Sequence, residues 1–139
     1  MHRLLKAGFK LAGSWGWLND EEKIIRANFT ECHNPPMKLL YAFVGEQRVV
    51  YYVGITTIGL RRRLKHYSDI TKSSGETNKR CNKKIKTELK KNKTIRIYTC
   101  PVPGNKKIGI FDVDYGPSLE QSIIKKLKSE DKAEWNLKQ

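Results

Sequence analysis

The chain is poor in cysteine, and its three cysteines are spaced too widely for a shared structural role. Cys32, Cys81 and Cys100 include no Cys-x-x-Cys pair, and their number is odd. This pattern disfavours both a disulfide framework and a zinc finger. His33 directly follows Cys32, which is poor geometry for a shared metal. We therefore expect free thiols in a reducing compartment and predict a cytoplasmic protein.

Acidic residues are scarce relative to basic ones. The sequence has 28 Lys and Arg against 14 Asp and Glu, which gives a net charge of +14. Between residues 61 and 107 the imbalance is sharper, with sixteen basic residues and three acids. Such an excess indicates a polyanionic partner, most often a nucleic acid. The alternative is a highly soluble surface without a partner, whereas membrane-surface binding lacks the strongly apolar helix face it requires.

Long apolar segments are also missing. Residues 4–12 faintly resemble a signal peptide, but Lys6 and Lys10 interrupt the apolar core of this stretch. No segment reaches the roughly 20 apolar residues of a membrane-spanning helix, so we expect no membrane contact. We interpret residues 1–36 as an N-terminal helical extension. Its Trp15 and Trp17 either pack on the core, stack on a base or meet a partner subunit.

Two β-rich runs around a polar turn form the strongest local pattern. Residues 39–44 and 49–54 flank the turn at residues 45–48, which is typical of a hairpin. The two simplest loop lengths both place Tyr41 directly opposite Tyr52, on one face of the sheet. Tyr51 is then expected on the other face. Ordinary cross-strand packing remains an alternative explanation for the two phenols.

An arginine shares the apolar stripe of the next predicted helix. Leu60, Leu64 and Tyr67 have helical spacing, and Arg63 falls inside their stripe. A basic residue on a core-facing stripe needs a partner or must extend to solvent. The other basic residues of this helix fall nearer the solvent side: Arg61, Arg62 and Lys65. The alternative is a solvated helix with three equivalent surface arginines.

A carboxylate occupies a similar position late in the chain. Ser118 and Gln121 form a capping-box pattern at a helix start. Glu120 then lies in line with the apolar residues of that helix, which are Ile123, Ile124 and Leu127. It is either a first-turn acid favoured by the helix dipole or a metal ligand at the edge of the core.

The order of these elements resembles the GIY-YIG nuclease family, in its small phage endonuclease form, over residues 38–137. Leu39-Leu40-Tyr41 and Tyr52-Val53-Gly54 stand where the family has its two triplets. Leu60-x-x-Arg63-Leu64 matches the arginine helix, and Glu120 matches the metal-binding glutamate. Asn136, within Trp135-Asn136-Leu137, matches the closing asparagine. The first triplet departs from the family because leucines replace its Gly and Ile.

The loop before the arginine helix is one residue longer than the family pattern. Counting rigidly from Tyr52 selects Arg62 and His66, whereas the helix stripe selects Arg63 and Tyr67. We follow the stripe, because loops absorb insertions and helix faces do not. The resemblance implies a mixed α/β fold, with a small central antiparallel sheet of about three strands flanked by helices. Residues 37–139 would form this nuclease domain.

The resemblance also implies roles for these residues. Glu120 would hold one Mg²⁺ ion, with Mn²⁺ as a substitute, and Arg63 would stabilise the transition-state charge. Tyr41 would orient or deprotonate the attacking water, and Tyr52 would hydrogen-bond it or the phosphate. The assisting residue would be Tyr67 or His66. Asn136 would tie down the Glu120 region or the metal waters.

The implied partner is DNA, most simply the double helix, in a host-cell cytoplasm if the protein is phage-encoded. The residues expected to bind its backbone are Arg61, Arg62, Lys65, Lys79, Arg80 and Lys83. The alternative functions are a non-catalytic basic nucleic-acid-binding module and a structural subunit of a nucleoprotein complex. The target sequence, the choice between DNA and RNA, and nicking versus double-strand cutting stay open. A homo-oligomer is one arrangement that would cut both strands.

Overall fold

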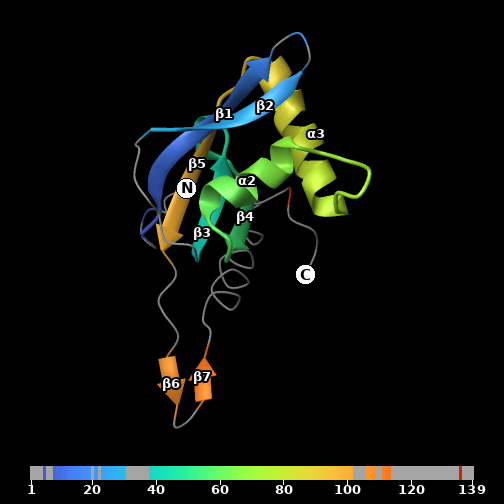
Figure 1. Ribbon diagram of the computed structural model, residues 1–139. Coiled ribbons are helices and arrows are strands. Elements are labelled where there is room, and N and C mark those ends of the chain that lie inside the picture. Colours follow the sequence, from blue (N-terminus) through green and yellow to red (C-terminus); the bar gives the residue numbers. More distant parts are fainter. Residues whose placement is uncertain are drawn as a thin grey trace.

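A five-stranded antiparallel sheet forms the centre of the protein (Figure 1). The computed structural model describes residues 5, 8–19, 21, 23–30, 38–101, 106–108, 111–113 and 135. The strands of the sheet are β1 (Lys10–Asn19), β2 (Ile24–Phe29), β3 (Leu39–Val44), β4 (Val50–Thr56) and β5 (Ile95–Pro101). Their spatial order is β2-β1-β5-β3-β4, so β5 is central and the β3–β4 hairpin lies at one side. A separate short pair joins β6 (Lys106–Ile108) to β7 (Phe111–Val113).

Two helices cover one face of this sheet (Figure 1). They are α2 (Leu60–Ser68) and α3 (Glu76–Lys90), and a 3₁₀ turn, η1 (Glu46–Arg48), connects β3 to β4. Helix α2 was predicted from its apolar spacing, and the structure confirms it. No helix of the described residues is long and apolar enough to cross a membrane.

The core has two layers because β3 is buried on both of its faces. Leu39, Tyr41 and Phe43 join the larger cluster under the helices. The alternate residues, Leu40, Ala42 and Val44, belong to a second cluster on the opposite face. Period-two alternation therefore separates the two layers, and it directs the aromatic residues of β3 toward the helices.

The prediction of helical structure in residues 1–36 is wrong for residues 10–19 and 24–29, which form β1 and β2. Two register irregularities in β1 disturb the regular alternation that would mark a strand. Position 13 requires glycine where β1 pairs with β2, because a Cβ atom there would lie 2.1 Å from the carbonyl oxygen of Asn28 on β2. The mixed α/β class is confirmed, but the sheet has five strands rather than about three.

The N-terminal strands are built into the same sheet as the later motifs, because β1 pairs directly with β5. The domain boundary at residue 36 stays a prediction. Trp15 is buried against Phe43 and Tyr67, which agrees with the packing alternative for this residue. Cys81 is a free thiol, as expected, and Cys32 lies outside the described residues.

Candidate active site

The hairpin places Tyr41 and Tyr52 on one face, but they are not directly opposite each other. Tyr41 pairs with Gly54, and Phe43 pairs with Tyr52. The predicted register is wrong because the turn runs through η1, whose Gln47 has a left-handed φ of 59°, and the register then shifts between Phe43 and Val44. The offset from the predicted pairing is an even number of residues, so the two phenols keep their common face. Their ring centroids lie 6.2 Å apart.

The same register shift overturns the prediction for Tyr51. An irregularity of this kind lets two consecutive residues of one strand oppose a single residue of its partner, and it disturbs strict alternation. Tyr51 packs against the core cluster under the helices, the cluster that also holds Tyr52. Its ring stacks on Trp135 at a centroid distance of 4.7 Å and an interplanar angle of 8°. Gly45 makes room for Tyr51, since a Cβ atom there would lie 2.2 Å from that ring.

Gly54, the glycine of the second triplet, has a direct steric role. A Cβ atom on Gly54 would lie 2.6 Å from the ring and hydroxyl of Tyr41, and 2.9 Å from the ring of Tyr52. Real Cβ atoms do not approach other heavy atoms so closely. The missing side chain therefore allows the ring of Tyr41 to lie across β4, with its hydroxyl directed toward α2.

The hydroxyl group of Tyr67 contacts the hydroxyl groups of Tyr41 and Tyr52. Its Oη lies 2.7 Å from Oη of Tyr41 and 3.4 Å from Oη of Tyr52. Tyr67 lies here because it belongs to the buried stripe of helix α2, together with Leu60 and Leu64. The three tyrosines are almost completely shielded from solvent, since Tyr41 is 1% exposed, Tyr67 0% and Tyr52 7%.

Arg63 brings a positive charge to this cluster. Its Nη2 donates a hydrogen bond to Oη of Tyr67 at 2.9 Å, and its Cζ lies 4.4 Å from the centre of the Tyr67 ring. Its Nη1 donates to Oδ1 of Asn78 on α3 at 3.0 Å. Arg62 and His66 are exposed, in contrast to the half-buried Arg63. The structure thus brings together the residues that the helix stripe selected, and not those of the rigid count.

The electrostatics favour neutral phenols around a charged guanidinium. Burial raises the pKa of Tyr41, and the nearby Tyr52 raises it further, although Arg63 and the hydrogen bond from Tyr67 lower it. Burial likewise raises the pKa of Tyr67 well above its ordinary value. Burial alone would lower the pKa of Arg63, but the phenols beside it reverse this effect, so its pKa is raised. Within the part of the chain that the structure describes, the site therefore holds the permanent positive charge of Arg63 among neutral hydroxyl groups.

The sequence analysis did not identify Asn78, which lies on α3 and accepts a hydrogen bond from Arg63 on α2. A single polar residue in a lysine-rich helix carries no periodic signal. It also missed Asn82, one turn later, whose Nδ2 donates to the carbonyl oxygen of Tyr67 at 2.7 Å. The only available hint was that both asparagines lie four residues apart and so share one side of the helix.

Trp135 is anchored beside this site. Its backbone N–H donates to the carbonyl oxygen of Tyr51 at 2.7 Å, and its own carbonyl accepts a hydrogen bond from Nε of Arg80 at 3.0 Å. Arg80, predicted to bind nucleic acid, thus uses one of its donors to hold Trp135. The neighbouring Asn136 and the predicted metal ligand Glu120 both lie outside the described residues.

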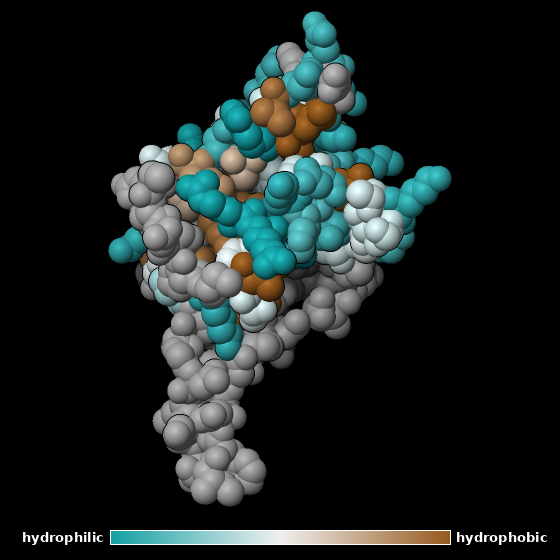
Figure 2. All heavy atoms as spheres, viewed as in Figure 1, coloured by the Kyte–Doolittle hydropathy of each residue, from teal (hydrophilic) through white to brown (hydrophobic). Residues whose placement is uncertain are grey.

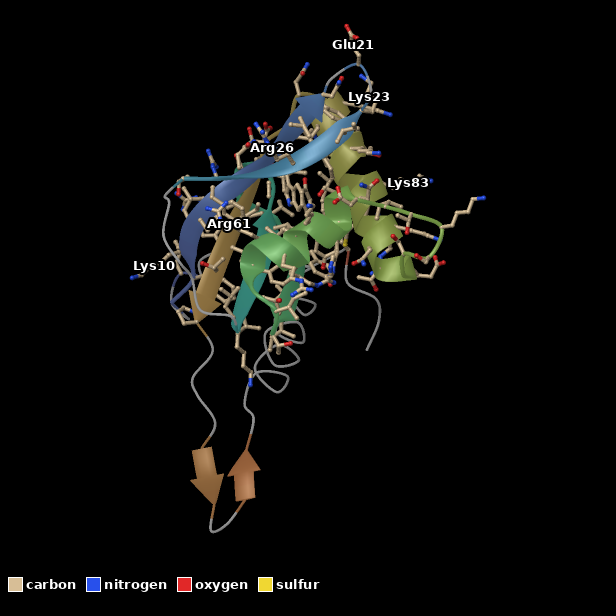
Figure 3. All side chains as sticks on the ribbon, in the orientation of Figure 1. Lys10, Glu21, Lys23, Arg26, Arg61 and Lys83 are labelled. Carbon is tan, nitrogen blue, oxygen red and sulfur yellow. The ribbon has the colours of Figure 1, made fainter. Side chains whose placement is uncertain are left out.

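The other predicted nucleic-acid contacts spread over the outer sides of the two helices. Cζ of Arg61 lies 4.3 Å from the centre of the Phe29 ring, toward β2, whereas Lys83 lies on the outer side of α3 (Figure 3). Lys65 is exposed beside Asp69 at 4.0 Å, and Nζ of Lys79 donates to the carbonyl of residue 72 at 3.5 Å. Hydrophilic side chains cover most of this face (Figure 2).

The described residues offer no cluster of three His, Cys, Asp or Glu side chains that would hold a metal ion. The site described so far consists of phenols, a guanidinium and an amide. These groups suit the stabilisation of an anion. A divalent ion would need the oxygen of a carboxylate in addition.

These features define a class of protein. The chain belongs to the GIY-YIG family, because the sequence model of the GIY-YIG catalytic domain matches residues 37–134. The predicted resemblance is thereby confirmed, and the site lies in the catalytic domain of a nuclease family.

Two solved structures have the same fold. A variant of bacteriophage T4 EndoII superposes with a TM-score of 0.75 at 18% sequence identity, over 98% of this chain and 97% of that chain. The restriction endonuclease Hpy188I, solved in complex with product DNA, gives a TM-score of 0.57 at 16% identity, over 94% of this chain and 80% of that chain. Comparison with curated protein sequences gives no significant match.

Proposed function

We propose that this protein is a divalent-metal-dependent endonuclease that hydrolyses phosphodiester bonds of DNA. The observation that carries the proposal is the hydrogen bond from Arg63 to the buried phenol of Tyr67, whose hydroxyl lies 2.7 Å from that of Tyr41. A guanidinium held by neutral partners keeps its full charge for an anionic substrate. Phosphodiester hydrolysis requires such a charge, because negative charge develops on the phosphoryl oxygens in the transition state.

The tyrosines would orient the nucleophile. Tyr52 is the most exposed of the three phenols, so it is best placed to hydrogen-bond an attacking water or a phosphate oxygen. The more deeply buried Tyr41 and Tyr67 would hold Tyr52 and Arg63 in position. The raised pKa values of Tyr41 and Tyr67 favour an orienting role over proton abstraction. Deprotonation of Tyr41 at neutral pH would need further positive charge beside it.

Glu120 would hold the divalent ion, together with phosphate oxygens and retained waters. One carboxylate with substrate oxygens fits Mg²⁺, which gives up its waters reluctantly, and Mn²⁺ would substitute. The bound ion would polarise the phosphate and stabilise the departing 3′ oxygen. Asn136 would tie down this region, and its neighbour Trp135 is already fixed by Tyr51 and Arg80.

Double-stranded DNA is the proposed substrate. The net charge of +14 supports a polyanionic partner, and Hpy188I was solved with product DNA. The basic residues on the outer sides of α2 and α3 would contact phosphates along the duplex. Because a single site cuts one strand at a time, a homo-oligomer or two successive nicks would be needed for a double-strand break.

Incubation of the purified protein with supercoiled plasmid tests this proposal. We expect nicked or linear DNA with Mg²⁺ or Mn²⁺ and intact plasmid with EDTA. Glu120→Gln should abolish cleavage and keep or strengthen DNA binding in a gel-shift assay, because a negative charge near the phosphate is lost. Glu76→Gln removes an exposed acid of α3 and should cleave normally. Plasmid that is bound but intact at every metal concentration would favour the non-catalytic binding module.

A further inference from the structure

The charge of Arg63 is useful only if its guanidinium plane is held in one orientation. A guanidinium carries five N–H donors in a rigid fork. Among the described residues, Nη2 donates to the Tyr67 hydroxyl and Nη1 donates to the Asn78 amide oxygen. The two acceptors come from different helices, so together they fix both the position and the rotation of the group.

The chemistry of Asn78 suits this task better than that of an acid. An aspartate would also accept a hydrogen bond from Arg63, but its negative charge would offset the charge that the substrate needs. An amide oxygen orients the guanidinium and leaves that charge intact. Among the described residues, no carboxylate forms an ion pair with Arg63.

Asn82 keeps Asn78 at the correct distance. Nδ2 of Asn82 donates to the carbonyl oxygen of Tyr67 at 2.7 Å, in the last turn of α2, where carbonyl groups lack partners within the helix. Asn82 is 7% exposed, so this hydrogen bond is shielded from water. The contact joins the end of α2 to α3, one turn beyond Asn78. Leu64 and Ile85, in the same core cluster, pack the two helices together.

We propose that Asn78 is a positioning residue, which holds the guanidinium of Arg63 in its productive orientation through a neutral hydrogen bond. Asn82 supports it by fixing α3 against the end of α2. This inference rests on the proposed function for its effect on rate, but the orientation itself can be measured without DNA.

The kinetic test compares Asn78→Ala with Thr77→Ala, a substitution at the neighbouring half-buried position of α3. Asn78→Ala should lower the single-turnover cleavage rate at saturating DNA by about tenfold or more. Its dissociation constant for DNA, and both constants of Thr77→Ala, should stay within about twofold of the wild-type values. Equal losses in the two variants, or a loss confined to binding, would overturn the proposal.

A double-mutant cycle asks whether Asn78 acts through Arg63. In an Arg63→Lys background the fork is already lost, so the added Asn78→Ala should change the rate by less than about twofold. A full tenfold loss in that background would mean that Asn78 acts by another route. Asn78→Asp keeps the acceptor but adds a negative charge, so it should bind DNA more weakly than Asn78→Ala does.

An NMR measurement separates this inference from the proposed function. In the free wild-type protein, the Arg63 side-chain nitrogens should show slowed rotation about the Cζ–Nη bonds, and Asn78→Ala should restore fast rotation. Thr77→Ala should leave the rotation slow. A wild-type protein with a rigid Arg63 and no nuclease activity would refute only the proposed function. Equal rotation rates in wild type and Asn78→Ala would refute the role of Asn78.

Discussion

Helix α2 carries arginines on two faces, and the arginine on one face is half-buried whereas those on the other are exposed. Arg63 is half-buried, and two hydrogen bonds and the ring of Tyr67 hold its guanidinium. Arg61 and Arg62, directly before it in sequence, are exposed. A charge that is partly removed from water and rigidly held acts strongly on one nearby anion, whereas an exposed charge is screened by solvent and salt. The comparison separates residues that act on the chemistry from residues that attract the substrate.

The largest expected effect follows from removing the buried charge. Arg63→Ala should lower the cleavage rate at saturating DNA by about 10²- to 10³-fold, the loss typical of a missing transition-state donor. The dissociation constant should change much less. Single-turnover kinetics with an excess of enzyme separates the two quantities. A variant that cleaves at the wild-type rate would remove Arg63 from the chemistry.

A smaller loss of cleavage rate is expected when a substitution on β4 displaces the ring of Tyr41. Gly54→Ala would place a Cβ atom 2.6 Å from the hydroxyl and ring of Tyr41, so that ring or the strand must move. We expect the free energy of unfolding to fall by about 1–3 kcal/mol, as for overpacked cores, and cleavage to slow. Urea denaturation measures the first quantity.

Gly75→Ala is the matched control for this change. Gly75 has an extended backbone with a φ of −69°, and nothing lies within 4 Å of a Cβ atom added there. Its substitution should cost clearly less than that of Gly54. Equal losses would show that the close approach of Tyr41 is relieved at no cost.

The site was predictable where periodicity survives local irregularity. Tyr41 and Tyr52 share a face despite a wrong register, because an even offset preserves the alternation of a strand. Arg63 was distinguishable from Arg62 because the stripe of α2 does not depend on the length of the loop before it. In both cases the regular repeat of a strand or a helix made the position of the side chain predictable.

The sequence was uninformative where single contacts decide the structure. Strands β1 and β2 were missed because bulges in β1 interrupt the expected alternation. The amide of Asn78 contacts Arg63 across 15 positions of sequence, and no local pattern marks such a pair. The left-handed φ of Gln47 in the turn shifted the register in a similar way, because a polar turn does not reveal its backbone conformation.

The smallest expected effect concerns the exposed face, and it tests the comparison most directly. Arg62→Ala should keep the single-turnover rate at saturating DNA. It should weaken binding and reduce the slope of log K against log salt by about one, the loss of one phosphate contact. Binding measured over a series of salt concentrations gives this slope. If Arg62→Ala abolished cleavage and Arg63→Ala remained active, the rigid count from Tyr52 would be correct. His66 would then replace Tyr67 as the assisting residue, and the buried network would serve only the stability of the fold.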